Sequence, residues 1–71
     1  MSRDKELISR LLEENEEFRK LHEEHIAFEE EIEKLMKKRP QTTELHFEIE
    51  TLKKKKLFGK DKMERILTKY R

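Results

Sequence analysis

The sequence predicts an all-α fold: an antiparallel two-helix coiled-coil hairpin that assembles into a dimeric helical bundle. Apolar residues recur at alternating spacings of three and four, which is the spacing of a coiled-coil seam. The single proline, Pro40, marks one clear break between two such stretches. Only 32% of the 71 residues are hydrophobic and 49% are charged, so one copy lacks the apolar side chains for a broad core. We therefore treat residues 1–71 as a single domain that gains burial by association.

The first helix is expected over about residues 3–38. Basic residues precede Pro40 and suit the negative end of a helix dipole, and proline cannot continue a helix. Asn15 is a favourable N-cap residue, so the sequence leaves open a break near it, with helical segments at about 3–14 and 16–38.

The second helix is expected over about residues 43–69, after a turn at about 39–42. Thr42 or Thr43 can cap its first turn. The only glycine, Gly59, costs about 1 kcal/mol in a helix interior relative to alanine, but the residues around it keep the helical periodicity. We therefore expect this helix to be continuous.

The apolar spacing assigns both helices to a heptad repeat, with the seam at positions a and d. Thirteen of the seventeen seam residues are apolar. In the first helix the seam residues are Leu7, Leu11, Glu14, Phe18, Leu21, His25, Phe28, Ile32 and Leu35. In the second they are Leu45, Ile49, Leu52, Lys56, Gly59, Met63, Ile66 and Tyr70.

The short turn selects an antiparallel register in which the numbers of facing residues add up to about 84. Four apolar pairs then meet in the seam: Phe18 with Ile66, Leu21 with Met63, Ile32 with Leu52, and Leu35 with Ile49. The same register brings four pairs of opposite charge together beside the seam: Glu17 with Lys69, Glu24 with Lys62, Glu31 with Lys55, and Lys38 with Glu48. Exposed pairs of this kind contribute about 0.2–1 kcal/mol each, so they are expected to select the register more than to hold the fold.

A second stripe of apolar residues runs along one flank of the expected hairpin, at positions e and b. These residues are Ile8, Leu12, Ile26, Met36, Leu57 and Leu67. Apolar area on a hairpin with a thin core is stabilised by burial, at about 25 cal/mol per Å². We therefore expect this flank to be the interaction surface, used for self-association as a dimer and open to a helix of another protein. The alternative is loose packing along a monomeric hairpin.

The middle of the seam contains three residues that do not suit an apolar core: His25, Lys56 and Gly59. A polar residue in a seam can fix register and oligomeric state at a cost in stability. Gly59 faces His25 in the expected register, so the missing side chain leaves room for the imidazole.

Four consecutive lysines, Lys53 to Lys56, raise the possibility of nucleic-acid binding through residues 53–62, with Phe58 as a stacking aromatic. Consecutive helical residues are about 100° apart, however, so the lysines are spread around the helix. Nine acidic and two basic residues between positions 13 and 31 give a balance of −7, against nine basic and two acidic, or +7, between 53 and 71. Self-neutralisation is therefore preferred, and nucleic-acid binding is the alternative function.

Other chemistry finds little support. His22 and His25 are one turn apart and could share a metal ion with Glu29, although the two imidazoles need not converge. No phosphate-binding loop or activated nucleophile is present, so we expect a non-enzymatic protein without cofactors. No apolar run approaches the roughly 20 residues that span a bilayer, and the N-terminus lacks the apolar segment of a secretory signal. With no cysteine in the chain, we expect a cytoplasmic location and no membrane contact.

Two segments resemble the YdcH-like family of small bacterial helical proteins, a domain of unknown function. The first is "FRKLHEEHIAFEEEIEKL", which carries Phe18, Leu21, Glu24, His25 and Ile32. The second is "LKKKKLFGKDKMERIL", which carries Leu52, Lys53, Lys54, Lys56, Leu57, Lys60 and Asp61. The resemblance implies a bacterial, cytoplasmic helical hairpin with no assigned activity. Phe28 and Gly59 depart from the family's pattern, in the middle of the expected hairpin.

Overall fold

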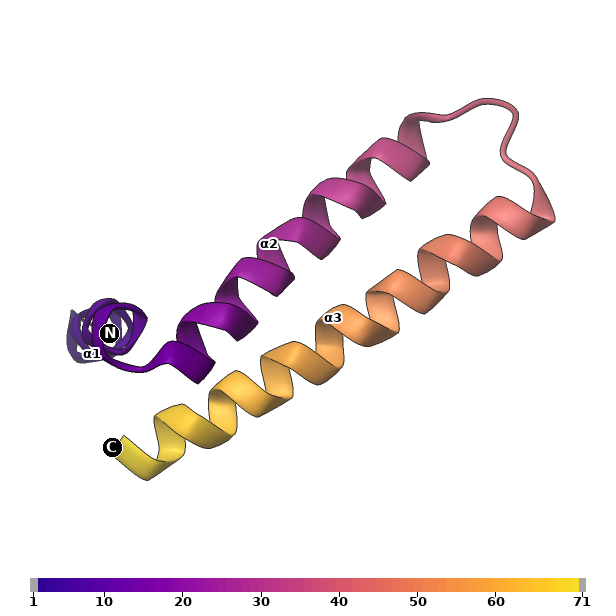
Figure 1. Cartoon of the computed structure of the whole chain (residues 1–71). Helices are drawn as coiled ribbons and strands as arrows, with labels where there is room; N and C mark the ends of the chain where they lie inside the picture. Colours follow the sequence, from indigo (N-terminus) through magenta and orange to yellow (C-terminus); the bar gives the residue numbers. More distant parts are fainter. Residues whose placement is uncertain (1, 71) are drawn as a thin grey trace.

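The computed structural model describes residues 2–70 of the chain, and within them every regular element is a helix (Figure 1). Helix α1 spans Ser2–Glu14, α2 spans Glu16–Lys37 and α3 spans Thr43–Tyr70. The expected all-helical fold is confirmed, and α3 runs without interruption through Gly59. The expected first helix is divided into α1 and α2 at Asn15, where the sequence left a break open.

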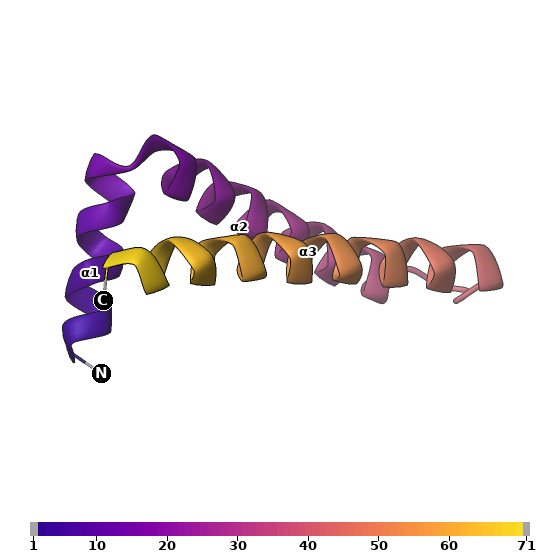
Figure 2. The same ribbon diagram turned by 90° about the horizontal axis from the view of Figure 1, so that it is seen from below.

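Helices α2 and α3 lie side by side and run in opposite directions, joined at one end by the turn after Lys37 (Figures 1 and 2). Helix α1 lies at the other end of this pair and runs across it, as Figure 2 shows most clearly. The C-terminal end of α3 therefore lies close to α1, although the two are far apart in the sequence.

Asn15 separates α1 from α2 as a single non-helical residue. Its backbone is extended, with φ −110° and ψ 106°, and its side-chain Oδ1 accepts a hydrogen bond of 2.9 Å from the Phe18 amide. An N-cap side chain of this kind satisfies an amide that has no carbonyl partner at the start of a helix. The break that the sequence left open is thus present, and the chain changes direction there.

The turn between α2 and α3 is held by hydrogen bonds to its exposed carbonyl groups. The Gln41 side-chain amide donates to the carbonyls of Leu35, Met36 and Lys38, with the shortest distance, 2.6 Å, to Lys38. Thr42 Oγ1 accepts from the Leu45 amide at 3.1 Å, so Thr42 caps α3. These contacts satisfy the groups that two helix ends leave without partners.

The buried apolar side chains form two separate clusters. The end cluster consists of Leu11, Phe18, Ile66 and Leu67, with Leu7, Ile8, Leu12, Leu21 and Met63 packed against it. The turn cluster consists of Ile32, Leu35 and Ile49, with Leu45 and Leu52 packed against it. Each of the four apolar pairs expected across the seam has both members in one cluster, in agreement with the expected register.

The four expected ion pairs beside the seam are absent. Among the described residues, none of these four Lys–Glu pairs lies within the distance of an ion pair. The pairs His25–Glu29 and Lys53–Glu50 do, but each lies within one helix. Lys and Glu side chains at exposed positions gain little from pairing relative to hydration, which gives the long side chains no reason to converge. The register therefore rests on the apolar clusters.

Candidate interaction surface

The middle of the α2–α3 pair belongs to neither apolar cluster. His25 and Phe28 on α2, and Lys56 and Gly59 on α3, are all half-buried, and none is part of the end cluster or the turn cluster. These are the positions at which the sequence predicts a polar seam. The two helices thus lack a continuous apolar core along their length.

His25 is held by its own helix. Its Nε2 lies 2.9 Å from Glu29 Oε1, one turn along α2, and its Nδ1 is buried without a hydrogen-bond partner. In a neutral imidazole one ring nitrogen donates and the other accepts, so the contact with Glu29 assigns the proton to Nε2. Nδ1 is then a buried acceptor that the rest of the described chain leaves without a donor.

Gly59 does not make room for the His25 imidazole. A Cβ atom built on Gly59 would have no heavy atom within 4 Å outside its own helical surroundings. The space beside Gly59 that the sequence predicts for the imidazole is therefore open. Of the three expected seam residues, His25 turns to Glu29, Gly59 borders open space, and Lys56 is half-buried.

The expected interaction surface divides into two parts. Ile8 and Leu12 pack against the end cluster, and Leu67 is buried within it at 5% exposure. The other three residues are exposed: Ile26 by 42%, Met36 by 51% and Leu57 by 59%. We call Ile26, Met36 and Leu57 the exposed flank.

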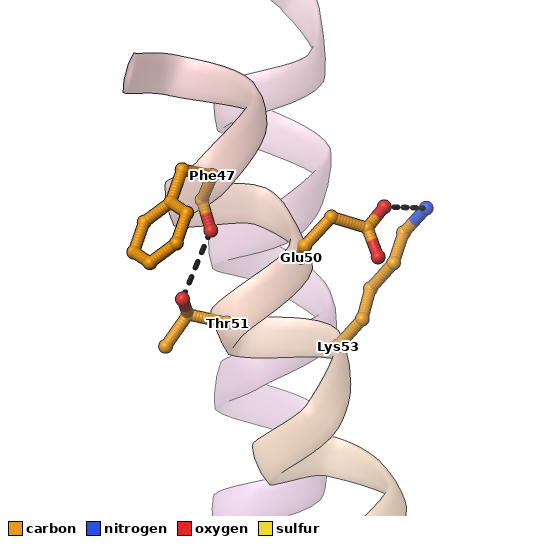
Figure 3. A network of polar contacts seen from close by, with 4 residues as sticks. All are labelled: Phe47, Glu50, Thr51 and Lys53. Carbon is orange, nitrogen blue, oxygen red and sulfur yellow. Dashed lines mark hydrogen bonds and ion pairs between the residues drawn. The ribbon is translucent and has the colours of Figure 1, made fainter. Parts of the chain in front are cut away.

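Near the turn, the exposed flank borders a shallow hollow of about 290 Å³. Its lining is mixed in chemistry and consists of Met36, Arg39, Gln41, His46, Ile49, Glu50 and Lys53. Figure 3 shows the side chains of Glu50 and Lys53 reaching toward one another, with 3.9 Å between Lys53 Nζ and Glu50 Oε1. This distance and the exposure of both groups make the contact weak. The hollow can accept a side chain that has both apolar and polar parts.

Three exposed aromatic residues were not assigned to the interaction surface from the sequence. Phe47 is 75% exposed, Phe58 is 69% exposed and Tyr70 is 56% exposed. Phe47 and Phe58 are eleven residues apart, which places them on one face of α3. Figure 3 shows the Phe47 ring projecting away from the helix, near the hydrogen bond of 2.9 Å from Thr51 Oγ1 to the Phe47 carbonyl. The heptad positions of Phe47 and Phe58, f and c, could have indicated their exposure from the sequence, because residues at these positions face away from the seam.

The four consecutive lysines of α3, Lys53 to Lys56, do not all lie on one face. Lys56 is half-buried, while Lys54 and Lys55 are exposed. Lys53 pairs with Glu50 on its own helix and not with a glutamate of α2. The cross-helix neutralisation expected for these lysines is therefore absent at the distances of ion pairs.

The candidate metal ligands His22 and His25 are not part of a group that could hold a metal ion among the described residues. Among residues 2–70, no three His, Cys, Asp or Glu side chains are placed together to hold a metal ion. His25 and Glu29 are in contact, but His22 does not complete a set of ligands with them. Within the same residues, no helix has the length and apolar character needed to cross a membrane.

The fold and the surface define a small all-helical protein built on an antiparallel helix pair. A family model described as "Protein of unknown function (DUF465)" matches residues 18–67. The chain belongs to this family, the YdcH-like small helical proteins. The match covers nearly all of α2 and most of α3, and helix α1 lies outside it. No curated protein and no solved structure matches the chain.

Proposed function

We propose that the protein is a small non-enzymatic interaction module, in which α2 and α3 form a coiled-coil hairpin that self-associates as a dimeric helical bundle. One observation carries the proposal. Three large apolar side chains, Ile26, Met36 and Leu57, are 42–59% exposed along the same flank, and Ile26 and Leu57 lie beside the section of the helix pair that has no apolar core. The family resemblance and the cysteine-free sequence support a cytoplasmic setting.

The end cluster supports a helix as the partner of this flank. Ile8, Leu12 and Leu67 occupy the same heptad positions as the exposed flank, and they lie in or against the end cluster, where α1 meets α2 and α3. A helix therefore already packs on one end of this stripe within the chain. A second copy would supply helices for the rest of the stripe, and burial of apolar area would stabilise the complex by about 25 cal/mol per Å². A dimer of two hairpins is then a four-helix bundle.

Sedimentation of surface variants tests the proposal. In Leu57→Glu, a charge in the centre of the exposed flank would have to be buried on association, so we expect the dimer to be lost at micromolar concentration. Phe47→Glu is the matched control because Phe47 is equally apolar and even more exposed, but lies on another face of α3. A dimer that Leu57→Glu leaves intact and Phe47→Glu abolishes would move the interface to the outer face of α3.

A second candidate function, nucleic-acid binding, is supported by a separate observation. Phe58 is 69% exposed and has Lys54 and Lys55 one turn before it and Lys62 one turn after it. An exposed aromatic ring among lysines suits a single-stranded nucleic acid, because bases stack on the ring while the lysines contact phosphates. The absence of ion pairs from these lysines to α2 removes part of the argument against it.

A gel-shift titration with a single-stranded oligonucleotide tests this second candidate. Binding at about 50 mM salt that is lost by about 200 mM, and that weakens in Phe58→Ala, would support it. Phe47→Ala is the control, since Phe47 is a more exposed aromatic residue with Glu44 and Glu50, and no lysine, one turn away on α3. No shift at low salt would remove the candidate.

A further inference from the structure

The connection between α1 and α2 is close to a continuous helix. The Asn15 amide donates to the Leu11 carbonyl at 2.8 Å, and the Asn15 carbonyl accepts from the Arg19 amide at 3.0 Å. Both bonds join residues four apart, as in an α-helix. A continuous helix would add only the backbone hydrogen bonds of the amides at positions 16–18. One of these, the Phe18 amide, donates to the Asn15 side chain in the bent form. A change at one residue therefore separates the bent connection from a straight one.

The apolar pattern also continues through Asn15 without a change of phase. Leu7 and Leu11 precede it, and Phe18 and Leu21 follow, so the a and d positions are occupied in the same heptad frame on both sides. A bend that separated two unrelated helices would not require this. The sequence is thus compatible both with the bent form and with one helix running through residues 2–37.

The straight form would take α1 away from its own end cluster. In the bent form α1 runs across the end of the α2–α3 pair and contributes Leu11 to that cluster, with Leu7, Ile8 and Leu12 packed against it (Figure 2). A helix that continues in the direction of α2 cannot also cross the end of the pair. Phe18, Ile66 and Leu67 would then be exposed to solvent, and so would the apolar face of α1. A second copy of the chain would bury both.

We infer that α1 is an exchangeable arm, which packs on its own end cluster in the monomer and on the end cluster of a second copy in a dimer. Short connections favour such exchange, because the same contacts form between two chains once the connection straightens. The inference rests on the proposed self-association and deepens it: the partner is the same, a second copy, but the residues that join the copies are those of α1 and the end cluster.

A pair of substitutions at Asn15 tests the hinge without touching either apolar surface. Asn15→Ala removes the cap of the bent form and favours helix at position 15, so it is expected to promote the dimer. Asn15→Gly nearly preserves the cap and disfavours the straight helix. Because two hinges straighten in each dimer, the difference in helix propensity counts twice, and the dissociation constants of the two variants should differ by at least about thirtyfold, measured by sedimentation equilibrium.

Mixing two damaged chains tests the exchange itself. Leu11→Glu disables the arm and leaves Leu67 in place, whereas Leu67→Glu disables the cluster and leaves the arm in place. In an exchanged dimer, the intact arm of the second chain packs on the intact cluster of the first. We expect the equimolar mixture to form a heterodimer that neither variant forms alone, seen as a new species by native mass spectrometry. A mixture that shows only the two separate variants would overturn the inference.

The two sets of variants separate this inference from the proposed function. If Leu57→Glu abolishes the dimer while Asn15→Ala and Asn15→Gly associate equally, the exposed flank joins the copies and the exchange is wrong. If the Asn15 variants differ as expected and Leu57→Glu associates normally, the arm joins the copies and the flank proposal is wrong. If Asn15→Ala remains monomeric at every concentration, the exchange is wrong whatever the flank does.

Discussion

Gly59 is the residue whose role the structure changes most. From the sequence it is expected to make space for His25, but a side chain at this position would meet open space and α3 continues through it. Heptad positions tell which residues face each other, but they do not tell how closely two helices approach at a given layer. That distance depends on the side chains of neighbouring layers, and at this section they form no apolar cluster.

Replacing Gly59 with alanine should therefore stabilise the protein. Alanine is favoured over glycine in a helix interior by about 1 kcal/mol, and no contact opposes the added methyl group. We expect the free energy of unfolding in urea to rise by about 0.5–1 kcal/mol. A loss of stability would show that the glycine is required by close packing that the monomer does not contain.

Glu31 represents the charged residues that were expected to pair across the seam. The expected contact with Lys55 is not formed, and the side chain of Glu31 is exposed. We expect Glu31→Gln to change the free energy of unfolding by less than about 0.5 kcal/mol. Phe18→Ala provides the contrast because Phe18 is fully buried, and its loss should cost about 3–5 kcal/mol. A loss of more than about 1 kcal/mol in the free energy of unfolding for Glu31→Gln would show that Glu31 forms a stabilising ion pair.

At the scale of helices, the α2–α3 pair, its register and its turn could be predicted from the sequence, because apolar spacing and a single proline specify them. Helix α1 could not. The cap at Asn15 indicates a break, whereas the continuous heptad frame indicates a single helix. Neither predicts the direction that the chain takes after a break. Leu67 was consequently expected on an open flank, whereas it lies in the end cluster beside residues of α1.

Helix α1 should be the first helix to open. It packs only at one end of the α2–α3 pair (Figure 1), whereas α2 and α3 contribute side chains to both clusters. Elements with fewer buried contacts exchange their amide hydrogens through openings of lower free energy. We expect amides of α1 to exchange faster than those of α2 residues in the turn cluster, by hydrogen exchange and NMR at low protein concentration. Equal protection of the two helices would mean that α1 opens only with the whole fold, which argues against an arm that detaches.

At the scale of the molecule, the clusters and the exposed surface are complementary in position. Core packing is confined to the two ends of the helix pair, and Ile26 and Leu57 lie exposed on the section between them. Only 32% of the residues are hydrophobic, and part of their apolar surface is still exposed to solvent. Membership of a family of unknown function gives no activity to explain this surface.

Sedimentation equilibrium of the unaltered protein over a range of micromolar concentrations measures self-association without any substitution. We predict that the weight-average mass rises with concentration from that of one chain, 8.8 kDa, toward that of two. A mass that stays at that of one chain over the whole range would show that the protein does not self-associate.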